Sequence, residues 1–249
     1  MQSSQDHPSA VSLRALRYIK GTAAFAVAAL LVLLAGCSAP PPSSGPAALR
    51  PPRPASDAVR YRIDEEHSEV LVWVRSEGPL AYLGHNHVIQ VGQLAGELWL
   101  APDPRRSVFT LSFPVAALRL DEPERRAQQG AGYEKALSAE DIAGTRAHLL
   151  DGALLDATDY PEIVLYSESI SGADAGWIAH TLIHVRSFSA HVDVPVKLET
   201  SPERVTLTGE FTVTHAMLGL VPHSALLGSL RVAQPLRIRF RITASRQLG

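Results

Sequence analysis

From Tyr61 onward, apolar and polar residues alternate with a period of two over most of the chain. Because successive side chains of a β-strand point to opposite faces of a sheet, this alternation predicts strands with one buried and one exposed face. It is clearest in Val205–His215 and Ile238–Ile242, where threonines or arginines separate the apolar residues. Further strands are predicted at Val70–Arg75, Val88–Leu100, Val108–Pro114, Ile163–Ile170, Trp177–Val185 and Phe188–Leu198. About eight such strands are typical of an all-β sandwich or a closed barrel.

The segment Asp121–Gly152 interrupts this alternation. Ser138, followed three residues later by Asp141, has the spacing of a capping box at the start of a helix. Gly152 suits the end of that helix. We therefore expect one or two short helices inserted between the strands and crossing the barrel. The apolar stripe of the main helix would consist of Ile142, Leu149 and Leu150.

The first residues of the chain have the pattern of a secretion signal. Three basic residues precede Thr22–Leu34, an uncharged apolar run of 13 residues. This run is too short to span a bilayer, which takes about 20 residues, but it has the length of a signal-peptide core. Leu34-Ala35-Gly36-Cys37 follows and resembles the bacterial lipobox, in which the cysteine is lipidated and becomes the N-terminus. We predict a lipoprotein signal peptide at 1–36. An ordinary secretory signal or an uncleaved anchor are the alternatives.

After Cys37 the chain is rich in proline, serine and alanine up to residue 59. Such a segment cannot bury a core, and its prolines make it stiff and extended. We predict a linker at 37–59 that separates a membrane anchor from a β-barrel domain at 60–246. Ser38 after the cysteine, in place of aspartate, fits retention in the outer membrane. The expected location is therefore the bacterial cell envelope, lipid-anchored at the outer membrane and facing the periplasm.

Composition excludes several classes of function. The formal net charge of −2 gives no basic excess for binding nucleic acid. Cys37 is the single cysteine, so the chain forms no internal disulfide and an acylated Cys37 leaves no cysteine nucleophile. There is no Gly-x-Ser-x-Gly motif and no glycine-rich phosphate loop. Ser189, His191 and Asp193 alternate on one strand and are interpreted as a solvated face, not a triad. We do not expect an enzyme.

Several motifs resemble the YceI-like family of periplasmic, lipocalin-like barrels that bind polyisoprenoid lipids. The resemblance covers about residues 60–245, and it implies an antiparallel barrel of about eight strands. A longer Glu122–Gly152 segment and the histidine-rich Gly84-His85-Asn86-His87 depart from the family pattern and indicate a subgroup. The motifs are Tyr61-Arg62-Ile63-Asp64 with His67-Ser68, Gly96-Glu97-Leu98, Leu155–Ile163 with its Tyr-Pro pair, Gly209-Glu210-Phe211 and Ile238-Arg239-Phe240.

The resemblance implies a hydrophobic ligand inside the barrel, an isoprenoid or similar amphiphile such as a quinone-like or polyprenyl lipid, and no other cofactor. A barrel of this size can hold one small ligand. The same inward residues would equally fill a solid core, which would make the protein a structural envelope lipoprotein. The sequence leaves open whether the barrel forms a homodimer. The predicted lining residues are Val70, Val72, Val74, Leu207, Phe211 and Val213.

Four polar residues complete the candidate site. His215 is the one histidine on an apolar strand face, and it either forms a hydrogen bond in the core or contacts a ligand head group. His85 and His87 would share a face of an extended segment, with Asn86 between them. We predict that this stretch lies at one mouth of the barrel and fixes a turn or a head group. The alternative is a metal-binding or redox-associated protein, although two histidines are fewer than the four ligands of a structural zinc site.

Overall fold

The computed structural model of the chain describes residues 51–173 and 176–247. The predicted signal peptide at 1–36, Cys37 and most of the predicted linker lie outside these residues. Within the described part, no helix is both long and apolar enough to cross a membrane.

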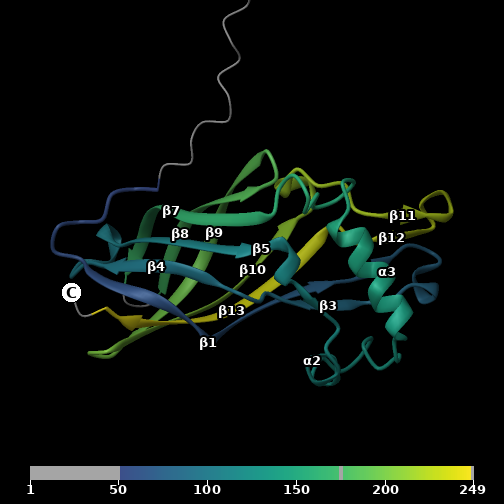
Figure 1. The fold of residues 1–249 in the computed structure, drawn as a ribbon, viewed down its shortest axis with the longest axis horizontal. Helices are drawn as coiled ribbons and strands as arrows, with labels where there is room; N and C mark the ends of the chain where they lie inside the picture. Colours follow the sequence, from purple (N-terminus) through teal and green to yellow (C-terminus); the bar gives the residue numbers. More distant parts are fainter. Residues whose placement is uncertain (1–50, 174–175, 248–249) are drawn as a thin grey trace, which may run out of the picture. The chain divides into compact units, whose positions relative to one another are not determined.

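Within the described residues, eight antiparallel strands close into a barrel (Figure 1). Their order around the barrel is β1, β13, β10, β9, β8, β7, β5 and β4, and β4 pairs with β1 again. Pairing of the first strand with the last leaves no free edge in this ring. The predicted all-β antiparallel barrel is confirmed. The strands are β1 Val59–Val74, β4 Ala95–Leu100, β5 Val108–Pro114, β7 Glu162–Ala173, β8 Gly176–Val185, β9 Phe188–Thr200, β10 Arg204–Thr214 and β13 Pro235–Arg246.

Strand β1 changes its partner along its length. Val59–Arg62 pairs with β4, whereas Leu71–Val74 pairs with β3 (His87–Gln90). The predicted single strand Val88–Leu100 was therefore wrong, because the chain turns between β3 and β4. Gln93 adopts a left-handed conformation in this turn, with φ at 53°. Strand β3 pairs in turn with β6 (Arg119–Leu120), so the wall next to β1 leads directly into the helical insertion.

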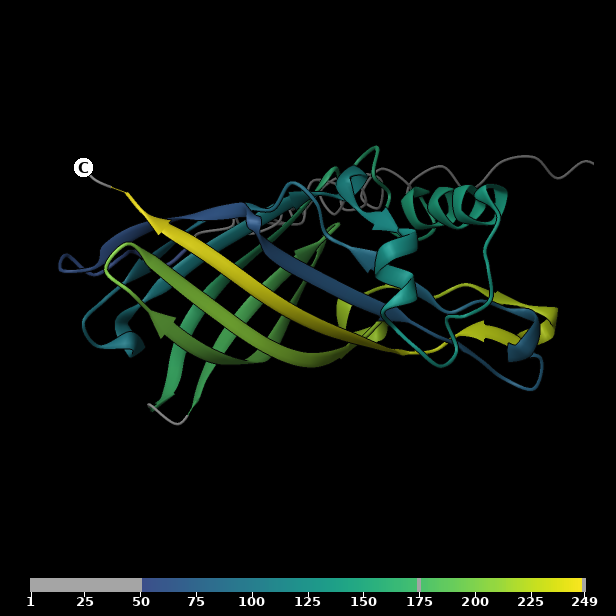
Figure 2. The same ribbon diagram turned by 90° about the horizontal axis from the view of Figure 1, so that it is seen from below.

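The insertion contains two helices, α2 (Pro123–Ala127) and α3 (Ala139–Leu150). The predicted capping box is confirmed, since the Ser138 and Asp141 side chains each bond the other's backbone N–H group. The helix ends at Leu150 with Asp151 as its C-cap, directly before the predicted stop at Gly152, although Gly152 does not adopt the left-handed conformation of a glycine cap. Figures 1 and 2 show α3 at the end of the barrel opposite the start of β1.

Short elements complete the fold, and the sequence did not predict them because two or three residues carry no periodic pattern. They include a small antiparallel sheet in which β12 pairs with both β11 and β2. The strands of this sheet are β2 Ser76–Glu77, β11 Ser224–Ala225 and β12 Leu230–Val232. The 3₁₀ helices are η1 Ala81–Leu83, η2 Pro104–Arg106, η3 Val115–Ala117, η4 Ala216–Leu218 and η5 Leu226–Gly228.

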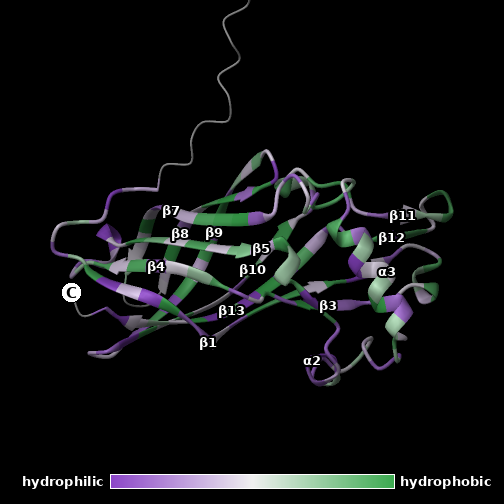
Figure 3. Ribbon diagram, in the orientation of Figure 1, coloured by the Kyte–Doolittle hydropathy of each residue, from purple (hydrophilic) through white to green (hydrophobic). Residues whose placement is uncertain are grey.

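The apolar residues divide into a large inner cluster and a small outer one. Alternate side chains of the barrel strands point inward, and Figure 3 shows the resulting alternation of hydrophobic and hydrophilic bands. On the outer face of β1, Leu71 and Trp73 pack with Val88 of β3 against Tyr133. The indole Nε1 of Trp73 donates to the Gln129 side chain at 2.7 Å. The segment after α2 therefore covers β1 from outside.

Two glycines are required where the backbone of neighbouring strands comes close. Gly96 has φ at 149°, and a Cβ atom there would lie 2.1 Å from the Thr110 carbonyl oxygen. A Cβ atom on Gly209 would lie 2.1 Å from the Pro195 carbonyl oxygen and 2.6 Å from the Phe240 ring. Any side chain at either position would push two strands apart.

We predict that Gly96→Ala lowers the free energy of unfolding by about 2–4 kcal/mol, through backbone strain and the clash with Thr110. Equilibrium urea unfolding measures this change. Gly144→Ala is the matched control, because Gly144 lies in the exposed interior of α3 with no atom within 4 Å of its Cβ position. It should stabilise the protein by about 0.5–1 kcal/mol. Equal effects of the two substitutions would contradict the assigned role of Gly96.

Candidate functional site

The barrel encloses a cavity of about 240 Å³ that is partly open to solvent. All eight barrel strands contribute inward side chains to its wall. Leu149 of α3, and Leu154 and Leu155 after it, also line the cavity, so the helical insertion forms part of the enclosure. Thr181 and His215 are the two polar residues among those that line it.

The cavity extends along the strands that line it. On β13, lining residues run from Leu236 to Ile242. At about 3.4 Å per residue, this corresponds to about 20 Å of strand. Leu218 of η4 and Leu220 after it line the cavity next to His215. The cavity therefore suits an extended, apolar molecule.

The structure places all the predicted interior residues in this wall. That their side chains contact a ligand stays a prediction. The sequence analysis did not assign the inward face of β5, Phe109, Leu111 and Phe113, although the period-two pattern of Val108–Pro114 contained this signal. The predicted residues found in the wall are Val70, Val72, Val74, Leu207, Phe211, Val213 and His215.

His215 lies directly after β10 and is only 5% exposed. Its ring Nδ1 and its backbone N–H group both bond the Gln234 carbonyl oxygen, each at 3.1 Å. Burial lowers the pKa of His215, although the hydrogen bond to the Gln234 carbonyl oxygen and the nearby backbone of Ala233 act in the opposite direction. Because a carbonyl oxygen only accepts, Nδ1 carries the proton of the neutral imidazole.

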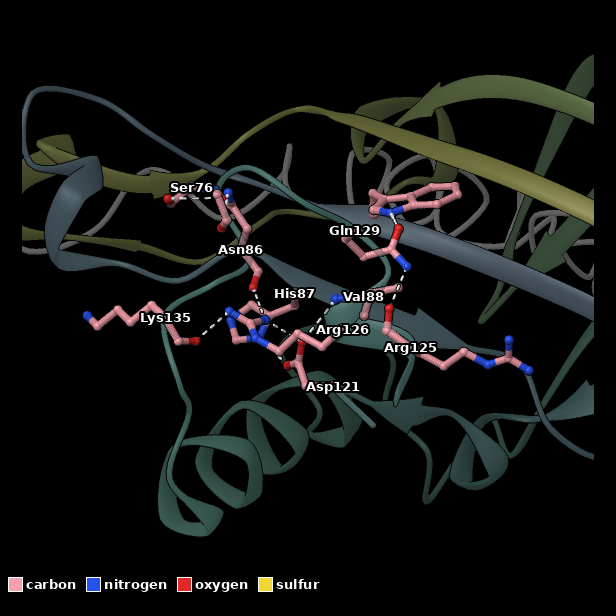
Figure 4. A network of polar contacts seen from close by, with 11 residues as sticks. Ser76, Asn86, His87, Val88, Asp121, Arg125, Arg126, Gln129 and Lys135 are labelled. Atoms are coloured by element: carbon pink, nitrogen blue, oxygen red, sulfur yellow. Dashed lines mark hydrogen bonds and ion pairs between the residues drawn. The ribbon is translucent and has the colours of Figure 1, made fainter. Parts of the chain in front are cut away.

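A buried carboxylate organises the histidine-rich stretch before β3 (Figure 4). Asp121, which has no exposed side-chain surface, accepts hydrogen bonds from His87 Nδ1 at 2.6 Å, the Val88 N–H group at 3.1 Å and Arg126 Nη1 at 2.8 Å. Burial alone would raise the pKa of Asp121, but the hydrogen bond and charge of His87, with the Val88 and Arg126 donors, hold that pKa below its usual value. His87 Nδ1 is thus committed to a structural hydrogen bond with a buried carboxylate.

Arg126 and Asn86 extend this network to neighbouring segments. The Arg126 guanidinium also donates to the carbonyl oxygens of Asn86 at 2.6 Å and Lys135 at 3.1 Å. The Asn86 side chain accepts from the Ser76 N–H group at 3.0 Å and donates to the Gly132 carbonyl oxygen at 3.0 Å. Figure 4 shows these contacts joining β2, β3, α2 and the loop after α2. Asp121, His87, Arg126 and Asn86 thus form a polar network that joins these segments outside the cavity wall. We call this network the clamp.

His85 does not join His87 on one face of a strand. Strand β3 begins at His87, and His85 lies in the irregular connection before it. The two rings meet edge to face, with centroids 6.2 Å apart. Burial, followed by the charge of Lys135, lowers the pKa of His85. Among the described residues, no group of three or more histidine, cysteine, aspartate or glutamate side chains is placed to hold a metal ion.

The outer face of β7, β8 and β9 contains a hydrogen-bonded serine, histidine and aspartate that the sequence did not indicate. Ser171 Oγ lies 2.9 Å from His180 Nε2, and His180 Nδ1 lies 2.7 Å from Asp193 Oδ1. A catalytic triad also needs a buried aspartate, a substrate pocket and donors for an oxyanion. The Asp193 side chain is 73% exposed, and Ser171 does not line the barrel cavity. We therefore assign no catalytic function to these three residues.

The residues expected to form a solvated face on β9 do not bond one another. His191 pairs instead with Glu168 across the sheet at 2.7 Å, and Ser189 pairs with His184 at 2.9 Å.

We predict that Asp121→Asn destabilises the protein by about 3–5 kcal/mol, because it leaves the buried Arg126 without its counter-charge. A carboxyl group whose pKa is lowered on folding stabilises the fold above its ordinary pKa of 3.8. This contribution disappears as the pH falls through the lowered value. Urea unfolding between pH 7 and pH 3 should therefore show a smaller loss of stability in Asp121→Asn than in the wild type.

The control is Asp103→Asn, because Asp103 pairs with Arg105 on the surface, where ion pairs contribute little. It should leave the unfolding curve at pH 7 nearly unchanged. A similar effect of both substitutions would contradict the assigned role of Asp121.

No protein-family model and no curated protein matches the sequence. The fold is similar to solved structures. BcnA of Burkholderia cenocepacia is 13% identical and matches with a TM-score of 0.54, over 73% of this chain and 98% of BcnA. A polyisoprenoid binding domain from Saccharophagus degradans, implicated in plant cell wall breakdown, is 11% identical with a TM-score of 0.49, over 76% of this chain and 99% of the domain. A Campylobacter jejuni YCEI protein is 6% identical with a TM-score of 0.48, over 64% of this chain and 85% of that protein.

At 13% identity, the similarity to BcnA shows a shared fold. From β1 to β13, the chain therefore shares the fold of BcnA, an antiparallel barrel as the sequence resemblance implied.

Proposed function

We propose that the barrel binds one elongated apolar lipid, an isoprenoid of the polyprenyl or quinone-like class, and carries or sequesters it. The observation that supports this function is the cavity of about 240 Å³ with an almost wholly apolar wall. Ligand sites are concave and mainly apolar, with a few polar groups that fix orientation. Here Thr181 and His215 are the polar residues of the wall.

The size of the cavity argues against a solidly filled structural barrel. At about 30 Å³ per water, it has room for about eight water molecules. Water needs polar partners, and this wall offers few of them. Without apolar contents, the wall lacks the contacts that a filled core would make, which is unfavourable. A bound lipid would supply those contacts.

The clamp around Asp121 supports the cavity without contacting its contents. It holds the start of β3, and Ile89 of β3 lines the cavity. It also ties down the loop that leads to α3, whose Leu149 lines the cavity as well. We assign Asn86 and His87 to this structural role. The metal-binding alternative has less support, because the described part of the chain brings no third histidine, cysteine, aspartate or glutamate together with the two histidines of the histidine-rich stretch to hold a metal ion.

We also propose that Cys37 is lipidated and anchors the barrel in the bacterial envelope, at the periplasmic side of the outer membrane. The lipobox-like Leu34-Ala35-Gly36-Cys37 after an apolar run of signal-peptide length supports this location. The linker at 37–59 would let the barrel stand away from the membrane. Stable anchoring needs more than one acyl chain.

We predict that Val72→Phe combined with Val194→Phe fills the cavity and weakens binding of a fluorescent apolar probe at least tenfold. Both valines line the cavity. The stability to urea should stay equal or rise, because the new rings occupy empty volume. Probe titration and urea unfolding measure the two effects.

Thr212→Phe is the control, because Thr212 is exposed on the outer face of β10 next to the inward Phe211 and Val213. It adds a ring of the same size and should leave probe binding unchanged. Probe binding that survives cavity filling, or that is lost equally in the control, would contradict the proposed site.

We predict that Cys37→Ser moves the protein from the membrane fraction to the soluble fraction of the bacterial envelope, because no acyl chain is attached. An alkyne-labelled palmitate added during growth should label the wild type and not the variant. Ser38→Ala, which keeps the cysteine, is the matched control and should stay labelled. Membrane retention of Cys37→Ser would favour an uncleaved anchor.

A further inference from the structure

His215 is the residue of the cavity wall that is best placed to form a hydrogen bond with a ligand. Of the two polar residues in the wall, Thr181 already donates its hydroxyl to the Ala179 carbonyl oxygen at 3.1 Å. His215 is 95% buried, yet it is one of the residues that line the cavity.

The protein holds this histidine in one orientation. Its backbone N–H group donates to the Gln234 carbonyl oxygen. Its own carbonyl oxygen accepts from the N–H groups of Leu218 at 3.0 Å and Leu220 at 2.9 Å. The ring is fixed by Nδ1, which donates to Gln234. A polar group held by such supporting bonds is preorganised for a ligand.

The tautomer then determines which ligand group fits. Nδ1 carries the proton and donates it in a hydrogen bond to the Gln234 carbonyl oxygen. The other ring nitrogen, Nε2, is therefore an acceptor in the neutral imidazole. Burial keeps the ring neutral by lowering the pKa of His215. A ligand must therefore supply a donor, and a hydroxyl group is the smallest donor that an otherwise apolar molecule can carry.

The rest of the wall disfavours a charged head group. Apart from Thr181 and His215, the residues that line the cavity are apolar, and none of them carries a positive charge. A phosphate or carboxylate placed here would be desolvated without a counter-ion, which is strongly unfavourable. An ether or ester oxygen at this position would face the lone pair of Nε2.

We propose that His215 Nε2 accepts a hydrogen bond from the hydroxyl group of the bound lipid, so that the barrel selects neutral apolar alcohols or phenols. This inference rests on the proposed lipid-binding function and adds the class of head group. The hydroxyl would lie at the η4 end of the cavity. The apolar tail would extend along the inward faces of β10 and β13.

The test compares three probes with one apolar tail: geranylgeraniol, its methyl ether and geranylgeranyl phosphate. Each displaces a fluorescent apolar reporter from the full-length protein. The wild type should bind the alcohol about fivefold to tenfold more tightly than the ether, in keeping with one buried hydrogen bond. It should bind the phosphate more weakly than the alcohol.

His215→Phe keeps a flat ring and removes the acceptor, so the preference for alcohol over ether should fall to about one while the ether still binds. His215→Leu is a second variant in case the first does not fold. Met217→Leu, at an exposed position of η4, is the control and should keep the preference.

The outcomes separate the two proposals. If the wild type binds none of the three probes, lipid binding itself is wrong and this inference fails with it. If the wild type binds alcohol and ether equally, binds the phosphate most tightly, or keeps its preference in His215→Phe and His215→Leu, the role of His215 is wrong and lipid binding stands.

Discussion

The structure depends on a closed sheet whose inward side chains are apolar and leave a cavity in the interior. Closure comes from the pairing of β1 with β13, which removes the free edges of the ring. The inward faces of the eight strands then enclose about 240 Å³. An empty apolar space of this size is costly in a folded protein. The cavity therefore links the fold to the proposed function, because a lipid inside it restores contacts that the protein's own side chains do not make.

A hollow barrel has fewer core contacts than a filled one, and this molecule has compensating contacts outside the ring. Strand β1 is buried on its outer face as well, where Trp73 lies beneath Tyr133 and beside the guanidinium groups of Arg237 and Arg239. The buried Asp121 binds His87 and Arg126. Loss of one partner from a buried ion pair is strongly destabilising, because the other charge is then left unpaired. Here the clamp fixes the path of the chain from β3 to α3 and so helps to define one end of the cavity.

Much of the barrel was predictable, because a strand with one buried face has a simple pattern. Val205–His215 alternated so regularly that its inward face, including His215, was assigned correctly from the sequence. The turn between β3 and β4 was missed, because Val91 and Leu94 are apolar like the strands and also line the cavity. The small sheet of β2, β11 and β12 was missed because its strands are too short to show any period.

The contacts between distant residues were not predictable. His87 and Asp121 are 34 positions apart, and Ser171, His180 and Asp193 meet only because three strands lie side by side. The histidine-rich stretch suggested chemistry, yet its partner shows that His87 has a structural role. His215 was visible as an odd residue on an apolar face, but only the Gln234 carbonyl oxygen reveals which ring nitrogen holds the proton. The period of the sequence pattern shows which side chains share a face of a strand. The hydrogen-bond partners of polar side chains depend instead on the three-dimensional path of the chain.

The central claim is that the barrel interior holds a lipid. Native mass spectrometry of the full-length protein, purified in mild detergent from bacterial membranes, tests it most directly, together with analysis of a solvent extract of the same sample. We predict a complex with one bound molecule whose mass, recovered in the extract, is that of an isoprenoid lipid. A protein that has only its own mass and yields no lipid on extraction would contradict the account.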